Sequence, residues 1–479
     1  MKKYLAFALA AILLIGCCSC RKTQTGANKD GEPVTITWLM WGDKQTDQES
    51  VNKKLDEISV PAINAKLDIQ YIDAGSYGER MKMNMASRTD SYDMCFVGFN
   101  NEYVDAAKKG GLYDITELLK NHKKLYDSIP QYEWDKCLIN GEIYAVPNVQ
   151  VGASAAALCV KKDLADEYGL DLTKIKTLEE IEPFLKWVKE NHPEVYPYRT
   201  SNVTGFKGDR PDLDTYNGVC VEEVNGKLVA KPDYEYDAQK TRYKLIRDWY
   251  LKGYIRKDNA TATDDSQDYN AGKFACWELA YKPGMEAEIY TSKGYEAYCI
   301  QITEAVTRSS GGTGTMIGIN ANSKNVEKAM DMIELIQTNE EFYNLICFGI
   351  EGKHYKVVDE RIVQDKNSGY MPTQTWRFGN QFNARLIEGQ PDGVWEATKK
   401  FNDEARVSPL NGFVFDTTPV RTEIAQLSTI TSKYSGLEKG VLDVDKSYAA
   451  MVAEEKKAGM DKVVAEVQKQ VDEFVKNKK

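Results

Sequence analysis

The stretches VTITWLMW (34–41), KQTDQESVNKKLDEI (44–58) and LDIQYI (67–72) decide the fold class of this chain. In the first and third, apolar residues alternate with polar ones, which is the period of a half-buried strand. In the second, apolar residues such as Val51 and Leu55 recur at helical spacing. A strand, a helix and a second strand in this order predict a βαβ unit, in which a helix connects two parallel strands.

The alternation of strands and helices continues along the chain. Further strands are predicted at 92–99, 141–147, 154–160 and 314–320, and further helices at 77–88, 101–111, 161–169, 178–188, 241–253, 326–337 and 462–479. This order predicts an α/β fold with a largely parallel sheet. A chain of 479 residues usually forms two or more domains of about 100–200 residues each.

The first residues have the three parts of a secretory signal. Two lysines precede a short apolar core that ends at Gly16, and Cys17 follows. The segment LIGC (14–17) also resembles the bacterial lipobox, in which the cysteine receives a diacylglycerol thioether and becomes the new N-terminus. We therefore expect a lipoprotein signal peptide at 1–16, lipidation of Cys17 and a flexible tether at 17–33. An ordinary signal peptide is the alternative.

Composition and motifs narrow the function classes. The formal net charge of −10 argues against a nucleic-acid partner, which needs a positive surface. The three histidines have no metal-ligand spacing, and neither a GxSxG elbow nor a phosphate-binding GK[ST] loop is present. We therefore expect no catalytic residues, no cofactor and no bound metal. A glycosidase carboxylate pair could still lie among the 72 acidic residues.

The cysteines beyond the signal region indicate buried free thiols. Several lie inside apolar runs such as YDMCFVGF and NLICFGI, and no CxxC motif occurs. Exported proteins in oxidising compartments rarely keep so many unpaired thiols. The pattern therefore suggests a cell that lives with little oxygen, and whether any of these cysteines pair stays open.

Four segments carry a resemblance to a known family. They are YDMCFVGFN (92–100), INGEIYAVPNVQ (139–150), YNAGKFACWELAY (269–281) and GTMIGINANSKNVEKAMDMIELIQT (314–338). Together with WGDKQTD after the first strand, and in this order, they resemble the extracellular solute-binding proteins of sugar-type ABC importers. The later part of the chain looks like the C-terminal domain of unknown function found in a Gram-positive lipoprotein branch of that family.

The resemblance implies a two-lobe fold of the type II periplasmic-binding-protein kind, with ligand held between lobes that are joined by crossing strands. We expect an N-terminal lobe of 34–148 plus 273–312. The C-terminal lobe would comprise 149–272 plus 313–479, including an extension domain from about residue 345. The chain would cross between lobes near 147–151, 272–275 and 313–318.

The function that the resemblance implies is ligand capture rather than catalysis. A monomeric, lipid-anchored protein on the extracellular face of the cell membrane would bind a saccharide, most simply an oligosaccharide, and deliver it to an ABC permease. The alternatives are the same scaffold binding another polar solute such as a peptide, a surface glycoside hydrolase, or a sensory or adhesive lipoprotein.

Sugars present flat apolar faces ringed by hydroxyls, so aromatic platforms combined with amides and carboxylates are suited to bind them. Such side chains follow the predicted strands and crossings. The candidate ligand-binding residues are Trp41, Asp43, Lys44, Tyr77, Asn100, Asn101, Glu102, Gln150, Trp277, Glu278, Trp376 and Asn380.

Each candidate also has a purely structural interpretation. Trp41 and Trp277 could pack in the cores of their strands. Asn100 could cap the next helix, and Tyr77 could be an ordinary surface side chain. Trp376 and its neighbour Asn380 could serve packing or turn formation.

Overall fold

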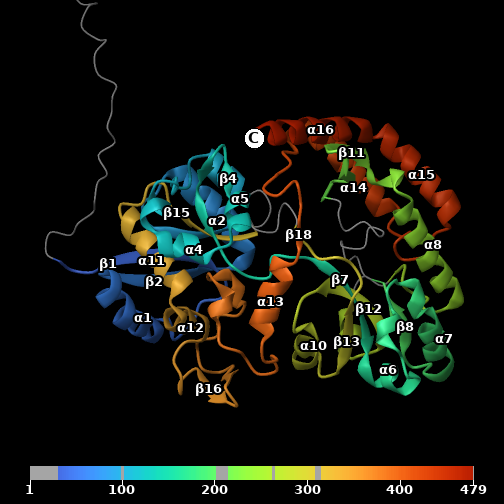
Figure 1. Cartoon of the computed structure of the whole chain (residues 1–479), viewed down its shortest axis with the longest axis horizontal. Coiled ribbons are helices and arrows are strands. Elements are labelled where there is room, and N and C mark those ends of the chain that lie inside the picture. The colour runs from blue at the N-terminus through green and yellow to red at the C-terminus, as the bar shows by residue number, and fades with distance from the viewer. Residues whose placement is uncertain (1–30, 99–101, 201–213, 262–264, 308–313, 478–479) are drawn as a thin grey trace, which may run out of the picture.

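The computed structural model describes residues 31–98, 102–200, 214–261, 265–307 and 314–477. The expected signal peptide, Cys17 and the candidates Asn100 and Asn101 lie outside these ranges. Within them, two α/β units lie side by side and define a two-lobe fold (Figure 1). We call the unit with the first strand lobe 1 and the other lobe 2.

Lobe 1 is built on a five-stranded sheet with the order β2-β1-β3-β15-β6. Its strands are β1 (Val34–Trp41), β2 (Ala65–Ile72), β3 (Met94–Gly98), β15 (Thr315–Ile319) and β6 (Ala145–Pro147). The first three are parallel, as the βαβ pattern predicts, and β15 runs antiparallel to β3. The packed helices include α1 (Gln48–Ile63), α2 (Ala74–Ser87), α11 (Val326–Thr338) and α12 (Glu340–Phe348).

Lobe 2 is built on a four-stranded sheet with the order β13-β7-β12-β8. Its strands are β7 (Ala155–Lys161), β8 (Tyr196–Arg199), β12 (Phe274–Tyr281) and β13 (Ala297–Gln301). The helices around it include α6 (Lys162–Tyr168), α7 (Glu182–Asn191), α8 (Asp237–Lys252) and α10 (Met285–Lys293). Strand β7 is antiparallel to both of its neighbours, so this sheet is mixed rather than parallel.

The expected division of the chain between the lobes is wrong in its second half. Strand β12, expected in the N-terminal lobe, pairs with β7 of lobe 2, and β15, expected in the C-terminal lobe, pairs with β3 of lobe 1. Residues of the segment 342–384 also belong to the core of lobe 1. Both strands are short apolar runs, and local pattern carries no information about which partner such a run finds.

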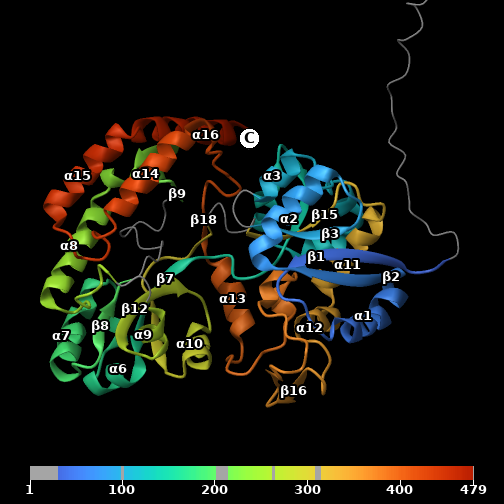
Figure 2. The same ribbon diagram turned by 180° about the vertical axis from the view of Figure 1, so that it is seen from behind.

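The C-terminal helices pack on lobe 2 through a small sheet. Strands β9 (Asp214–Tyr216), β10 (Val219–Val224) and β11 (Lys227–Pro232) meet α14 (Arg421–Lys433) and α16 (Met460–Asn477). Helix α15 (Val444–Lys457) packs instead against α8, α14 and α16. Val463, Val467 and Val471 recur at helical spacing on α16 and pack into the hydrophobic cluster between this helix and the small sheet. Figure 2 shows α16 extending over lobe 2, with its C-terminal end toward lobe 1.

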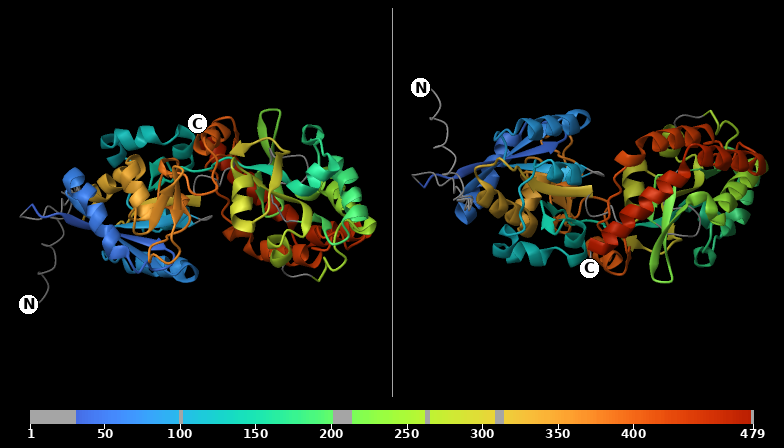
Figure 3. Two further views of the ribbon diagram at one scale, coloured as in Figure 1. Left: turned by 90° about the horizontal axis from the view of Figure 1, so that it is seen from below. Right: turned by 90° about the horizontal axis from the view of Figure 1, so that it is seen from above.

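Within the described ranges, parts of three chain segments lie between the lobes. Ser154 forms a bridge with Val306 of β14 (Val306–Thr307), which in turn pairs in parallel with Arg406 of β18 (Arg406–Val407). Helix α13 (Val394–Asp403) leads into the third segment and lies between the lobes in Figure 3 as in Figure 1. The segment 147–151, where the first crossing was predicted, lies on the path from β6 of lobe 1 to β7 of lobe 2. The predicted crossing at 313–318 overlaps β15, which pairs within the sheet of lobe 1. The predicted crossing at 272–275 is wrong, because that segment stays within lobe 2.

The Asn402 side chain holds the first crossing segment to the third. Its Oδ1 accepts hydrogen bonds from the backbone N–H of Gly152 (2.9 Å) and Ala153 (3.1 Å), and its Nδ2 donates to the carbonyl of Gln150 (2.7 Å). The residue is 5 % exposed. One amide thus satisfies three backbone groups at the hinge, and we call this contact the Asn402 clasp.

Asn402→Ala should lower the free energy of unfolding by about 1–3 kcal/mol, because buried backbone groups lose their partners. Asn270→Ala is the control, since the exposed Asn270 amide oxygen accepts a hydrogen bond from the Lys293 ammonium and serves no buried backbone group. Urea unfolding of both variants checks this. Equal stability of the two variants would contradict the clasp.

His354 has a structural role in lobe 1. The ring is wholly buried, its Nδ1 accepts from the Ile350 N–H (2.9 Å), and its Nε2 therefore donates to Asp47 Oδ2 (2.9 Å). Lys353 Nζ lies 2.7 Å from the same carboxylate. Asp47 precedes α1, so these bonds attach the 350–354 loop to the N-terminal helix of lobe 1.

The hydrogen bonds from Lys353 and then His354 lower the pKa of Asp47 below its ordinary value of 3.8. A lowered pKa in the folded state adds stability above the unfolded pKa and loses it as the pH falls through the folded value. Asp47→Asn should therefore be less stable than the wild type at pH 7, and the difference should shrink toward pH 3.8 and below. Chemical denaturation across this pH range measures it, and a constant difference would contradict the assignment.

Candidate functional site

Two tryptophans from distant parts of the chain meet where β1 ends. Trp41 is the last residue of β1, and its ring centroid lies 5.9 Å from that of Trp376 at an interplanar angle of 45°. Phe96 of β3 contacts Trp41 edge-on at 6.0 Å. Both indoles are half-buried, so the pair is anchored in lobe 1 while part of its surface stays open. We call it the Trp41–Trp376 pair.

Arg377 supports Trp41 from within the lobe. Its guanidinium carbon lies 4.5 Å from the Trp41 ring centroid, and Nη1 donates to the Trp41 carbonyl oxygen. The next residue is Gly42 at φ 134°, where an added Cβ would lie 2.6 Å from Arg377 Nη1. A side chain at position 42 would therefore displace the guanidinium. Burial lowers the pKa of Arg377.

The Trp41–Trp376 pair is hydrogen-bonded to the first crossing segment through the backbone of 376–381. Asn148 Nδ2 donates to the Trp376 carbonyl (3.2 Å), and the Gln381 N–H donates to the Val149 carbonyl (2.8 Å). Beside them, Gln150 Nε2 donates to Thr315 Oγ1 of β15 (2.8 Å). The predicted candidates Trp41, Trp376 and Gln150 are thus brought together at the hinge-facing edge of lobe 1.

The remaining lobe 1 candidates lie at the same edge or close to strand ends. Asp43 and Lys44 are exposed after Gly42, and the charge of Asp43 acts on Arg377. Asn380 is half-buried and accepts from the Phe382 N–H (3.1 Å), which is turn chemistry. Glu102 is exposed at the first residue of α3 (Glu102–Lys108).

Three candidates belong to the interior instead. Tyr77 lies within α2, is 5 % exposed and donates its hydroxyl toward the carbonyls of Leu39 and Phe96, so it is a core residue rather than a loop cover. Trp277 is wholly buried, with Tyr269 and Tyr295 against its ring. The prediction of Tyr77 on a loop and of Trp277 exposed after a crossing is therefore wrong, because the first lies on a helix and the second inside the sheet of lobe 2.

The third interior candidate, Glu278, is also wholly buried. Its carboxylate accepts from Arg242 Nη2 (2.9 and 3.0 Å) and from the Tyr198 hydroxyl. A buried carboxylate needs such partners, because desolvation disfavours its charge. Sequence spacing could not show that an arginine on α8 would reach it.

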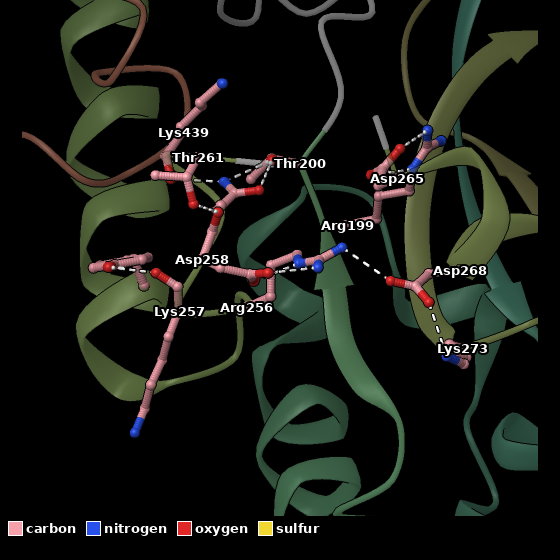
Figure 4. A network of polar contacts seen from close by, with 12 residues as sticks. Arg199, Thr200, Arg256, Lys257, Asp258, Thr261, Asp265, Asp268, Lys273 and Lys439 are labelled. Atoms are coloured by element: carbon pink, nitrogen blue, oxygen red, sulfur yellow. Dashed lines mark hydrogen bonds and ion pairs between the residues drawn. The ribbon is translucent and has the colours of Figure 1, made fainter. Parts of the chain in front are cut away.

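Lobe 2 presents a charged network at the end of β8, drawn in Figure 4. Arg199 donates to both carboxylate oxygens of Asp265 (2.8 and 2.6 Å), and its guanidinium lies 4.3 Å from the Tyr269 ring centroid. The Arg256 guanidinium likewise donates charge-paired hydrogen bonds to the carboxylates of Asp258 and Asp268. Sequence analysis missed this network, since charged residues scattered over 199–273 share no local motif.

The described residues contain no group of three or more His, Cys, Asp or Glu side chains placed to hold a metal ion. Across the same part of the chain, no helix combines the length and apolarity needed to cross a membrane.

Comparison with known proteins places the chain in a family. The model of the bacterial extracellular solute-binding proteins matches residues 55–341, more than half of the chain, and the chain belongs to that family. A domain of unknown function, DUF3502, matches residues 409–476. The match begins well after residue 345, where we expected the extension domain to start.

Two curated relatives have names that refer to carbohydrate binding or transport. A carbohydrate ABC transporter substrate-binding protein of Streptococcus pneumoniae serotype 4 is 31% identical, over 100% of this chain and 99% of the relative. The polygalacturonan/rhamnogalacturonan-binding protein YtcQ of Bacillus subtilis strain 168 is 23% identical, over 78% of this chain and 76% of that protein.

Solved structures agree with the two-lobe fold. The N-glycan transport solute-binding protein NgtS of S. pneumoniae is 29% identical and superposes with a TM-score of 0.81, covering 93% of this chain and 100% of NgtS. The complexes of NgtS with Man1GlcNAc and Man5GlcNAc superpose with TM-scores of 0.67 and 0.65 at the same identity.

Trp277→Ala should lower the free energy of unfolding by about 3–5 kcal/mol, because it empties a fully packed core position. Trp41→Ala should cost clearly less, since the Trp41 ring is only half-buried. Urea unfolding followed by circular dichroism compares them. Equal losses would contradict the different environments of the two indoles.

Proposed function

We propose that this chain is the carbohydrate-binding component of an ABC importer and captures an oligosaccharide between its lobes. The observation that carries the proposal is the Trp41–Trp376 pair at the hinge-facing edge of lobe 1, in a chain that belongs to the solute-binding family. An indole surface that is partly open offers the flat apolar contact that a pyranose face requires.

The polar groups around the pair fit the same ligand. The Gln150 amide can donate to or accept from sugar hydroxyls, and the Asp43 carboxylate can accept from them. Both residues lie on the segments that flank the indoles. The charged network around Arg199 and Asp265 is the partner surface that we propose for lobe 2. Ligand would then contact both lobes.

Closure of the lobes about the hinge completes the proposal. NgtS superposes on this chain with a TM-score of 0.81, and its two glycan complexes superpose with 0.67 and 0.65. The identity is 29% in all three cases, so sequence does not account for the difference in the scores, and we infer that the arrangement of the lobes does. We infer that the lobes of this chain are in an open arrangement in the structure and that a saccharide draws them together.

Delivery and location follow from the same assignment. We propose that the closed, loaded form docks on the transmembrane subunits of a permease. We also propose that Cys17 carries the lipid that keeps the monomer at the extracellular face of the membrane. The protein would release its ligand unchanged, so it is a binder and not a glycoside hydrolase.

Trp41→Ala and Trp376→Ala should each weaken oligosaccharide binding about tenfold or more, which corresponds to about 1.4 kcal/mol. Isothermal titration with mannose- and N-acetylglucosamine-containing oligosaccharides measures it. Tyr290→Ala is the matched control, because this aromatic is 56% exposed on α10 of lobe 2.

Two further measurements complete the test. Small-angle scattering of the wild type should show a smaller radius of gyration with saturating ligand, and chromatography should recover that ligand intact. Cleavage of the glycan would replace the proposal by a hydrolase. Unchanged oligosaccharide affinity in both tryptophan variants would show that the ligand does not bind at the Trp41–Trp376 pair.

A further inference from the structure

Cys159 and Cys299 lie directly opposite each other in the sheet of lobe 2. They are paired residues of the antiparallel strands β7 and β13. The flanking backbone bonds run from the Lys162 N–H to the Glu296 carbonyl (3.0 Å) and from the Ile302 N–H to the Ala156 carbonyl (2.9 Å). This phase places the two cysteines at a non-hydrogen-bonded pair, where opposite Cα atoms are only about 4.5 Å apart.

The geometry suits a covalent link. Directly paired residues project to the same face, and the two sulfur atoms are 2.8 Å apart. A Cα separation of about 4.5 Å lies within the range of about 4.4–6.8 Å in which disulfides form without backbone movement. The two thiols can therefore join while the strand register stays as it is.

The two cysteines differ in their access to solvent. Cys159 is wholly buried in the central strand β7, whereas Cys299 is partly exposed on β13, the edge strand of the sheet. The Cys299 N–H points away from β7 and donates to Glu286 Oε1 on α10 (2.8 Å). An oxidant from solution therefore reaches Cys299 first.

We propose that Cys159 and Cys299 form a disulfide when the folded chain meets a disulfide oxidant. The Cys299 thiolate attacks one sulfur of the oxidant RSSR, which releases one thiolate RS⁻ and leaves a mixed disulfide on Cys299. Cys159 then loses its proton and attacks the Cys299 sulfur, which expels the second RS⁻. Two protein thiols are oxidised, and one RSSR is reduced to two RSH after protonation.

The link would stabilise lobe 2. It joins positions 140 residues apart in the chain and ties the edge strand to the centre of the sheet. Closing so long a loop restricts the unfolded state. The site is separate from the Trp41–Trp376 pair in lobe 1, so the proposal does not rest on the proposed function.

The experiment uses the full chain, first reduced with dithiothreitol, desalted and then incubated folded with oxidised glutathione. Peptide mapping without reduction should show residues 137–161 linked to 294–308, the two tryptic peptides that carry Cys159 and Cys299. The melting temperature should rise by several degrees and return after reduction.

Three variants assign the link. Cys299→Ser and Cys159→Ser should each abolish the linked peptides and the thermal shift. The second variant is needed because peptide 137–161 also contains Cys137. Cys276→Ser is the matched control, since this buried cysteine of the neighbouring strand β12 faces Val160, and it should form the link like the wild type.

Two results would overturn the proposal. One is a folded chain that keeps both thiols after incubation with oxidised glutathione. The other is Cys299 that stops at the mixed disulfide with glutathione while Cys159 remains a thiol, because the second exchange would then be sterically barred.

Discussion

The whole molecule depends on how three chain segments pass between two sheets. The segments meet in one short strip, Ser154 beside Val306 and Val306 beside Arg406, and the Asn402 clasp binds the first segment to the third. The backbone groups that the clasp serves, on Gln150, Gly152 and Ala153, are partly or wholly shielded from water and need partners. Because a single amide serves three of them, the strip is narrow, and a narrow strip is what allows two rigid lobes to rotate against each other.

The C-terminal region adds a second contact across the lobes. Asn411 Nδ2 donates to the Tyr132 carbonyl (3.0 Å) on α5 (Gln131–Lys136), an element of lobe 1. On the same helix, Lys136 and Glu133 form a buried ion pair at 3.1 Å, and an added Cβ at Gly152 would lie 2.8 Å from Glu133 Oε1. The region after the hinge thus lies against lobe 1 before its helices pack on lobe 2. We infer that this contact limits the range of lobe movement.

The candidate site shows why long-range contacts matter more than motifs. Trp41 and Trp376 are predicted separately, and each has a structural alternative; their meeting is what makes a platform. Arg377 completes it, yet its role depends on the absence of a side chain at Gly42, which no count of aromatic or polar residues could reveal. The same limit explains the errors at Tyr77 and Trp277, because local sequence does not show which neighbours cover an aromatic ring.

The sequence by itself determined the class of fold, because hydrophobic period is local: β1 and the helix and strand that follow it lie where the pattern predicts. It also determined the resemblance that points to ligand capture. Only the tertiary structure decided which lobe receives β12 and β15, which indoles stay open, and which cysteines face each other. These outcomes depend on pairing between residues far apart in the chain, and the free energy of such pairing is not recorded in any single stretch of sequence.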